Sequence, residues 1–268
     1  MWTVFKHTIK ESIHRRMAVV LLTVACLFGG VMIGTSRFSP GPKDSVQIAF
    51  LNQPPMDAVQ FVLNIETSLL AITTGLLFLV AMFAMAPLLV TYVEKGMAEL
   101  LFAKGVARWE VFLGRVMGAF ALFVAAMVMM DIFPALYFWV RAGITLRYFT
   151  VSVLLLAASY LSMLCLMALV SAFQPSVASV VTIGFIDLII SSILLNRSIL
   201  QRFFQNEFLH KGMDVLYYVF PKHEELSRMA ASYLNLGHVP SWTPLWSTLG
   251  FCVGALMIAC WKMSRKSF

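Results

Sequence analysis

The stretch TSLLAITTGLLFLVAMFAMAPLLVTYV, residues 67–93, contains no charged residue. As an α-helix it exceeds the roughly 20 residues that the hydrocarbon core of a bilayer requires. Its apolar side chains would lie on every face of such a helix, which leaves no face for water. The stretch therefore predicts a membrane-spanning helix, and Pro87 predicts a kink within it.

Five further apolar stretches flank this one. Between the fourth and fifth spans, Gln174 and Pro175 interrupt a long uncharged run, and a proline cannot continue a helix. We therefore expect an all-α membrane protein, a single transmembrane domain over residues 1–268. The remaining predicted spans are residues 17–34, 116–140, 149–172, 176–195 and 244–261.

The composition leaves little room for another class of protein. Of the 268 residues, 60% are hydrophobic and 12% are charged, whereas soluble domains carry about 25% charged residues. The length excludes a separate soluble enzyme domain beside six spans. The net charge of +7 comes from basic residues that flank apolar stretches, so the expected partner is anionic membrane lipid and not nucleic acid.

Sequence motifs for catalysis are missing. The chain has no GxxxxGK[ST] phosphate loop, no HExxH and no GxSxG. His223 with Glu224 and Glu225 lacks a third ligand at a suitable spacing for a metal. The four cysteines lie in apolar stretches and are predicted to be small buried residues. We therefore expect no catalytic residue, no metal site and no cofactor on this chain.

The distribution of basic residues predicts the orientation. Six spans place both termini on one side, and Lys and Arg are about twice as dense in the segments on that side. Both termini are therefore expected in the cytosol, and residues 196–243 form the largest outer segment, in which Pro221 opens a short helix.

Residues 1–16 show the periodicity of an amphipathic helix. Trp2, Phe5, Ile9 and Ile13 recur at helical spacing, and charged residues occupy other positions: Lys6, Lys10, Glu11 and Arg15. Such a helix is suited to lie in the headgroup layer. The alternative is a plain extension of the first span.

Two acids fall within predicted spans. Asp187 is near the middle of the fifth, and Asp131 is toward the outer end of the third. An ionisable group in a span is costly and marks a pathway, a subunit interface or a paired interior contact. For Asp187 we leave these open, and for Asp131 we expect a packing contact.

Residues 94–115, EKGMAELLFAKGVARWEVFLGR, form the main inner loop. A segment that only joined two spans could be a few residues long. This one mixes acids, bases, Leu and Phe, which is typical of a docking surface for a cytosolic protein; the alternative is a solvated hairpin.

Residues 92–118 resemble the segment that follows the second span in type-2 ABC exporter permeases. The resemblance rests on an opening acid, Glu94, a leucine pair, a small-residue turn at Gly105, a basic residue, Arg108, and a Gly-Arg pair that enters the third span. The family often has Pro in the turn and Lys at the end, where this chain has Gly105-Val106-Ala107 and Arg115.

This resemblance implies a permease subunit of the bacterial cytoplasmic (inner) membrane that forms a homodimer. It implies two separate ATPase subunits that bind ATP and Mg, and an interfacial elbow helix at residues 1–16. It places the ATPase-coupling residues in the inner loop, at Glu94, Glu99, Leu101, Phe102 and Arg108. It also allows an extracytoplasmic partner at residues 196–243, and it leaves the substrate open.

Two alternatives use the intramembrane acids. Asp131 and Asp187 could carry out acid–base catalysis in an intramembrane enzyme if they met across a water molecule. They could also serve a secondary transporter, although the sequence shows neither inverted repeats nor paired broken helices.

Overall fold

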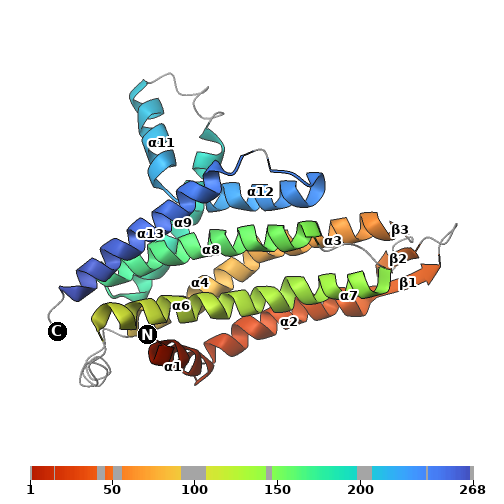
Figure 1. Cartoon of the computed structure of the whole chain (residues 1–268), viewed down its shortest axis with the longest axis horizontal. Coiled ribbons are helices and arrows are strands. Elements are labelled where there is room, and N and C mark those ends of the chain that lie inside the picture. The colour runs from red at the N-terminus through yellow and green to blue at the C-terminus, as the bar shows by residue number, and fades with distance from the viewer. Residues whose placement is uncertain are drawn as a thin grey trace.

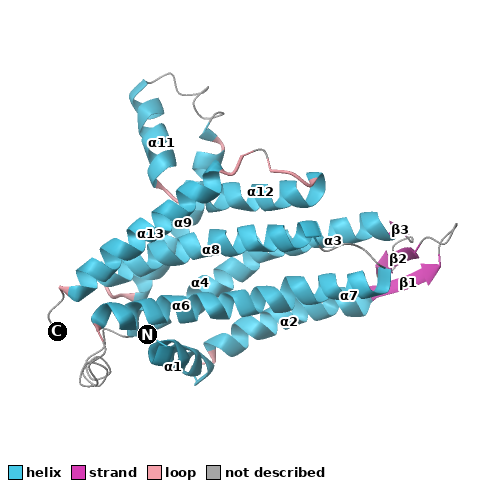
Figure 2. Cartoon of the chain, in the orientation of Figure 1, coloured by secondary structure: helices cyan, strands magenta, loops and turns pink. Residues whose placement is uncertain are grey.

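The computed structural model describes residues 2–14, 16–40, 46–50, 56–91, 107–142, 147–197, 207–239 and 241–265. Within these ranges the chain is mainly helical, and most of the long helices run along the longest axis of the molecule (Figure 1, Figure 2). Both termini and the beginning of α6 lie at one end of the bundle (Figure 1). The helices are α1 (Trp2–His14), α2 (Met17–Thr35), α3 (Ala58–Ile72), α4 (Phe78–Val90), α6 (Arg108–Met127), α7 (Phe133–Ala142), α8 (Arg147–Phe173), α9 (Val177–Leu195), α11 (Glu207–Val219), α12 (His223–Leu236) and α13 (Thr243–Ser264).

Six helical stretches in the described residues are long and apolar enough to span a membrane, which is consistent with the predicted all-α membrane protein. They are Met17–Thr35, Leu63–Val90, Arg108–Arg141, Phe149–Phe173, Val177–Leu195 and Thr243–Ser264. The second begins before the predicted residue 67 and thereby includes Glu66. The third begins at Arg108, so that residues 108–115, which were predicted as loop, form the first two turns of a spanning helix.

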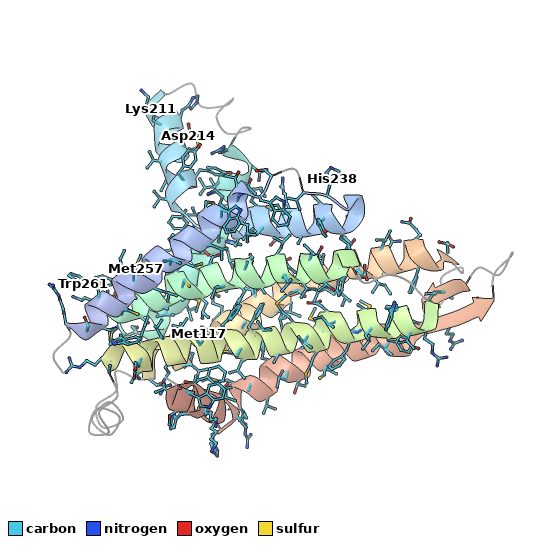
Figure 3. The ribbon with its side chains drawn as sticks, in the orientation of Figure 1. Met117, Lys211, Asp214, His238, Met257 and Trp261 are labelled. Atoms are coloured by element: carbon cyan, nitrogen blue, oxygen red, sulfur yellow. The ribbon has the colours of Figure 1, made fainter. Side chains whose placement is uncertain are left out.

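Tryptophans lie near the ends of these stretches. All six are exposed on the molecular surface, at 43% or more of their area. Trp109, Trp139 and Trp261 lie within four residues of a helix end, and Trp242 and Trp246 flank the start of α13. Exposed Trp at both ends of spans is the pattern of the aromatic belts at membrane–water interfaces. Other large apolar side chains, such as Met257 on α13, also face outward (Figure 3).

Two spans contain a widened turn. The π-helical segments η2 (Thr73–Leu77) and η4 (Val128–Ile132) lie within the second and third spans. Thr73 on η2 donates a hydrogen bond to Asp131 on η4, at 3.0 Å. The sequence placed Asp131 and Pro134 within one predicted span, residues 116–140. The structure continues this span through a π-bulge, with Pro134 at the start of α7, where a proline is tolerated.

A small antiparallel sheet joins α2 to α3. It consists of β1 (Ser36–Pro40), β2 (Val46–Phe50) and β3 (Met56–Asp57), and Phe38 pairs with Ile48 in its register. It lies at the end of the bundle opposite the chain termini (Figure 2). These strands were not predicted, because each is too short to stand out in the sequence beside the apolar helices.

Helix α8 is central to the packing and contacts α4, α6, α9, α12 and α13. The ring of Tyr160 stacks on Phe123 of α6, with 3.5 Å between centroids, and meets Phe78 of α4 edge to face. In lipid the hydrophobic effect adds little between helices, so dispersion contacts of this kind provide the packing energy.

The segment between the fifth and sixth spans contains two helices of different character. Helix α11 extends away from the bundle, and Lys211 and Asp214 lie on it (Figure 3). Helix α12 packs along α8 instead. The helix expected after Pro221 is confirmed as α12.

The cysteine prediction holds for two of the four residues. Cys165 and Cys252 are buried between α8 and α13. Cys26 is exposed on α2 and Cys260 is half-buried, because their positions in α2 and α13 turn toward the outside of the bundle.

Candidate functional site: three buried polar clusters

Buried polar groups stand out in a bundle that lipid surrounds, because each needs a partner inside the protein. Among the described residues, three clusters of such groups join different helices. We name them the inner clamp (Glu11, Thr91, Arg115), the π-bulge pair (Thr73, Asp131) and the α12 socket (Asp187, His223 and the groups around them).

The inner clamp joins three elements at the end of the bundle that holds the termini. Arg115 on α6 is 1% exposed, and its Nη1 lies 2.6 Å from Oε2 of Glu11 on α1. The same nitrogen donates to Oγ1 of Thr91, at 3.1 Å, and to the carbonyl oxygen of Leu88 at the end of α4, at 3.4 Å. Thr91 in turn donates to Oε1 of Glu11, at 3.2 Å. One guanidinium group therefore ties α1, α4 and α6 together.

Close backbone packing holds α1 beside the clamp. A Cβ atom on Gly118 would lie 2.8 Å from Cβ of Thr8, which is closer than real Cβ contacts. Gly118 is therefore needed for α1 to approach α6 this closely. Thr8 is fully buried there and satisfies its hydroxyl by donating to the carbonyl oxygen of Val4, at 2.9 Å.

The π-bulge pair lies where the second and third spans cross. Asp131 is fully buried, and both of its carboxylate oxygens accept from Thr73, at 3.0 and 3.2 Å. Glu66, which is 5% exposed, precedes Thr73 by seven residues and so lies on the same face of the second span. π-Bulges occur frequently at functional sites, and here two of them face each other across a carboxylate.

The α12 socket surrounds a helix start inside the bundle. Nδ1 of His223 lies 3.4 Å from Oδ2 of Asp187 on α9, and these two side chains are 3% and 0% exposed. Asp187 is near the middle of α9, and Ser159, near the middle of α8, donates to the carbonyl oxygen of His223, at 3.1 Å. Helix α12 thus begins level with the middle of two spans.

Side chains from other helices satisfy the backbone at this helix start. The N–H of Glu224 donates to Oγ of Ser191 on α9, at 3.0 Å, and the N–H of Lys222 to Oγ1 of Thr248 on α13, at 3.3 Å. The first N–H groups of a helix have no intrahelical acceptor, and within a bilayer they must find one in the protein. The positive end of the α12 dipole also favours a carboxylate such as Asp187 beside it.

Polar and charged groups from α11, from α12 and from the turn between them lie beside Ser191 of the socket. Lys222 is 5% exposed, and burial lowers its pKa below the ordinary value, opposed by the nearby Glu225 carboxylate. Its Nζ donates to Oγ of Ser247, at 2.6 Å. The hydroxyl of Tyr217 donates to Glu225, at 2.9 Å, and burial together with this hydrogen bond raises the pKa of Tyr217 to about 12.

The structure places the predicted site residues unevenly. Asp131 and Asp187 belong to different clusters, each with its own neighbour. Arg108 opens α6 and is partly exposed. The remaining predicted coupling residues, Glu94, Glu99, Leu101 and Phe102, lie outside the described residues. Among the described residues, no group of three His, Cys, Asp or Glu side chains could hold a metal ion.

Sequence reasoning missed the partners in these clusters. Glu11 and Arg115 are far apart in sequence, and no local pattern pairs them. Glu66 was placed just before the second span, and His223 was considered only as a metal ligand. The one signal in the sequence for a buried partner was a charged residue directly next to a predicted span. Glu66 and Arg115 both show it.

Comparisons with known proteins give no family for this chain. It matches no protein-family model, and no curated protein matches it.

Proposed function

We propose that this chain is the membrane-spanning permease subunit of an ABC exporter and that a separate subunit hydrolyses ATP. The observation that carries the proposal is the inner clamp. It joins α1 to Thr91, directly after α4, and to Arg115, in the second turn of α6, so it ties α1 to the helix on each side of the inner loop.

The clamp suits a segment that receives force. Because Arg115 bonds both to Glu11 and to the end of the second span, a push on residues 92–107 is delivered to the second and third spans and to α1 together. A packed bundle responds to such a push by moving between discrete arrangements and not by gradual deformation. A segment that only connected two helices would not need a buried, triply bonded guanidinium group at its base.

The proposal assigns roles to the remaining parts. Glu94, Glu99, Leu101, Phe102 and Arg108 dock the ATPase, which carries ATP and Mg. Helix α1 is the interfacial elbow helix, both termini are cytosolic, and two copies of the chain form the pore in the bacterial inner membrane. An extracytoplasmic partner would bind at the segment 196–243, where that segment leaves the bundle.

The π-bulge pair and the α12 socket are compatible with this role. Both provide polar contacts between helices, and both would have to rearrange if the bundle changed between inward-open and outward-open states. An intramembrane enzyme would instead need Asp131 and Asp187 within reach of one substrate. Asp131 bonds to Thr73 and Asp187 lies against His223, so the arrangement of these acids does not favour that alternative.

The test begins with the complex as it exists in native membranes. The chain is purified through an affinity tag under mild detergent, and its partners are identified by mass spectrometry. The proposal predicts a stoichiometric P-loop ATPase and vanadate-sensitive ATP hydrolysis in the purified sample. If a fully folded, purified chain carries no ATPase, the proposal is wrong.

A pair of variants ties the test to the clamp. Arg115→Ala should leave the ATPase bound and reduce coupling, seen as ATP hydrolysis that no longer responds to reconstitution into lipid. Arg141→Ala, an exposed residue near the opposite end of the same span, is the matched control and should behave as wild type. If ATP hydrolysis by the two variants responds equally to reconstitution into lipid, the clamp has no role in coupling.

A further inference from the structure

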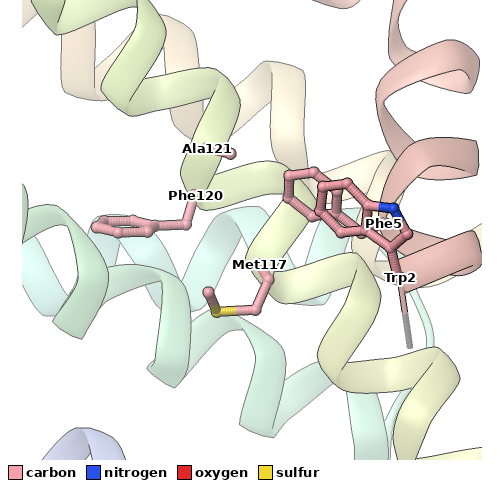
Figure 4. Close-up of a pocket in the computed structure, with 5 residues that line it drawn as sticks. All are labelled: Trp2, Phe5, Met117, Phe120 and Ala121. Carbon is pink, nitrogen blue, oxygen red and sulfur yellow. The ribbon is translucent and has the colours of Figure 1, made fainter.

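An apolar groove lies between α1 and α6. Its walls are Trp2 and Phe5 on α1 and Met117, Phe120 and Ala121 on α6, and its volume is about 520 Å³ (Figure 4). The rings of Trp2 and Phe5 stack with 5.1 Å between centroids and form one wall. This volume falls within the range of sites that bind small molecules, and every lining side chain is apolar.

Basic residues line the neighbouring face of α1. Lys6, His7, Lys10 and His14 are exposed on it, whereas its one acid, Glu11, is buried against Arg115. The Nζ atom of Lys6 lies 5.2 Å from the centroid of the Trp2 ring, so an ammonium group stands at the edge of the groove. The apolar groove therefore lies next to an exposed, basic face of α1.

We propose that this groove binds one acyl chain of an anionic phospholipid from the surrounding bilayer, with the headgroup phosphate at Lys6. An acyl chain matches the apolar walls, and an anionic headgroup matches Lys6 and the other exposed basic side chains of α1. A second protein surface would have to desolvate Lys6 and Lys10 to reach the same groove, which is costly unless it supplies acids.

The bound chain would contact both helices that the inner clamp joins. Trp2 and Phe5 belong to the same helix as Glu11, and Met117 neighbours Gly118, where α1 makes its closest approach to α6. Lipid in the groove would therefore hold α1 against α6. This inference does not depend on an ATPase partner, and it can fail or succeed independently of the proposed function.

The experiment uses brominated acyl chains, which quench a tryptophan that they touch. The full chain is reconstituted in phosphatidylcholine nanodiscs that contain a rising fraction of dibrominated phosphatidylglycerol or, separately, of dibrominated phosphatidylcholine. The fluorescence of Trp2 is the difference between wild type and Trp2→Phe, which keeps the stacked ring. We expect half-maximal quenching of Trp2 at a several-fold lower fraction of the phosphatidylglycerol.

Two further changes separate charge from shape. Lys6→Gln should reduce the preference for phosphatidylglycerol roughly fivefold, since one basic residue near an anionic surface contributes about 1 kcal/mol. Ala121→Phe should fill the groove and weaken the quenching of Trp2 by both lipids. Ala125→Phe is the matched control, because Ala125 is exposed on the same helix and outside the groove, and it should change nothing.

Two results would overturn the inference. One is equal quenching of Trp2 by the two lipids with no effect of Ala121→Phe. The other is protection of Trp2 from both lipids in a sample that native mass spectrometry shows to be dimeric, which would assign the groove to a second copy. If Lys6→Gln does not fold, the comparison of Ala121→Phe with Ala125→Phe still shows whether the groove binds an acyl chain.

Discussion

The pair of Asp187 and His223 gives the sharpest prediction about stability. Both side chains are inaccessible, their nearest N and O atoms are 3.4 Å apart, and neither makes a hydrogen bond to another described residue. Asp187→Leu removes the carboxylate and leaves the imidazole buried at the start of α12 without its partner. His223→Leu does the reverse and leaves a buried carboxylate.

Each single change should lower the free energy of unfolding by about 2–3 kcal/mol. This range lies within the roughly 1–3 kcal/mol that it costs to leave a buried polar group without its partner. The double variant Asp187→Leu/His223→Leu leaves no unpaired ionisable group, so its loss should fall short of the sum of the single losses by at least about 1.5 kcal/mol.

The measurement is unfolding by SDS in mixed micelles, followed by tryptophan fluorescence, for all four proteins of the cycle. The control combines Asp131→Asn with His223→Leu. Asp131 belongs to the π-bulge pair, so the losses in free energy of unfolding caused by these two changes should add. Additivity of Asp187→Leu and His223→Leu within about 0.5 kcal/mol would refute the reasoning that these groups act as a pair.

Three further predictions concern other parts of the molecule. In a Cys-free background, an impermeant thiol reagent applied to intact cells should label Asn235→Cys but should label Ala107→Cys only after permeabilisation; the reverse would overturn the cytosolic placement of the termini. Gly118→Leu should detach α1 and lower the free energy of unfolding by about 1–3 kcal/mol, because a side chain there collides with Thr8. The control is Gly250→Leu, at a position open to the surroundings, which should leave the thermal melt unchanged. In the purified complex, Phe102→Ala should weaken ATPase binding by about 2 kcal/mol and more than Arg108→Ala does, since buried apolar anchors carry more affinity than rim charges; a pull-down titration that ranks them the other way would contradict it.

The sequence predicted the spans because lipid imposes a simple requirement on them. A run of uncharged residues such as 67–93 has few structural options other than a helix across the bilayer. The break at Pro175 was equally readable, since the structure ends α8 at Phe173 and begins α9 at Val177. Local chemistry decides these features, and local chemistry is visible in one sequence.

The clusters could not be predicted because they depend on which helices become neighbours. Arg115 was read as the end of a loop, although pairing with Glu11 allows it to be buried in a helix. Asp131 and Asp187 were recognised as unusual, but Thr73 and His223, their neighbours, follow from packing between distant segments. The start of α6 was misplaced for the same reason: a charged residue counts against a span unless its partner is known.

Site-specific photo-crosslinking can show whether the segment after the second span docks a nucleotide-hydrolysing subunit. A photoreactive amino acid is placed at Phe102, and at Leu136 as a control, which is exposed on α7 toward the opposite end of the third span. We expect ultraviolet light to join the Phe102 position, and not the Leu136 position, to a protein with a P-loop ATPase motif. If the Phe102 position crosslinks only to lipid or to this chain itself, in a sample that is folded and inserted, the segment does not dock an ATPase.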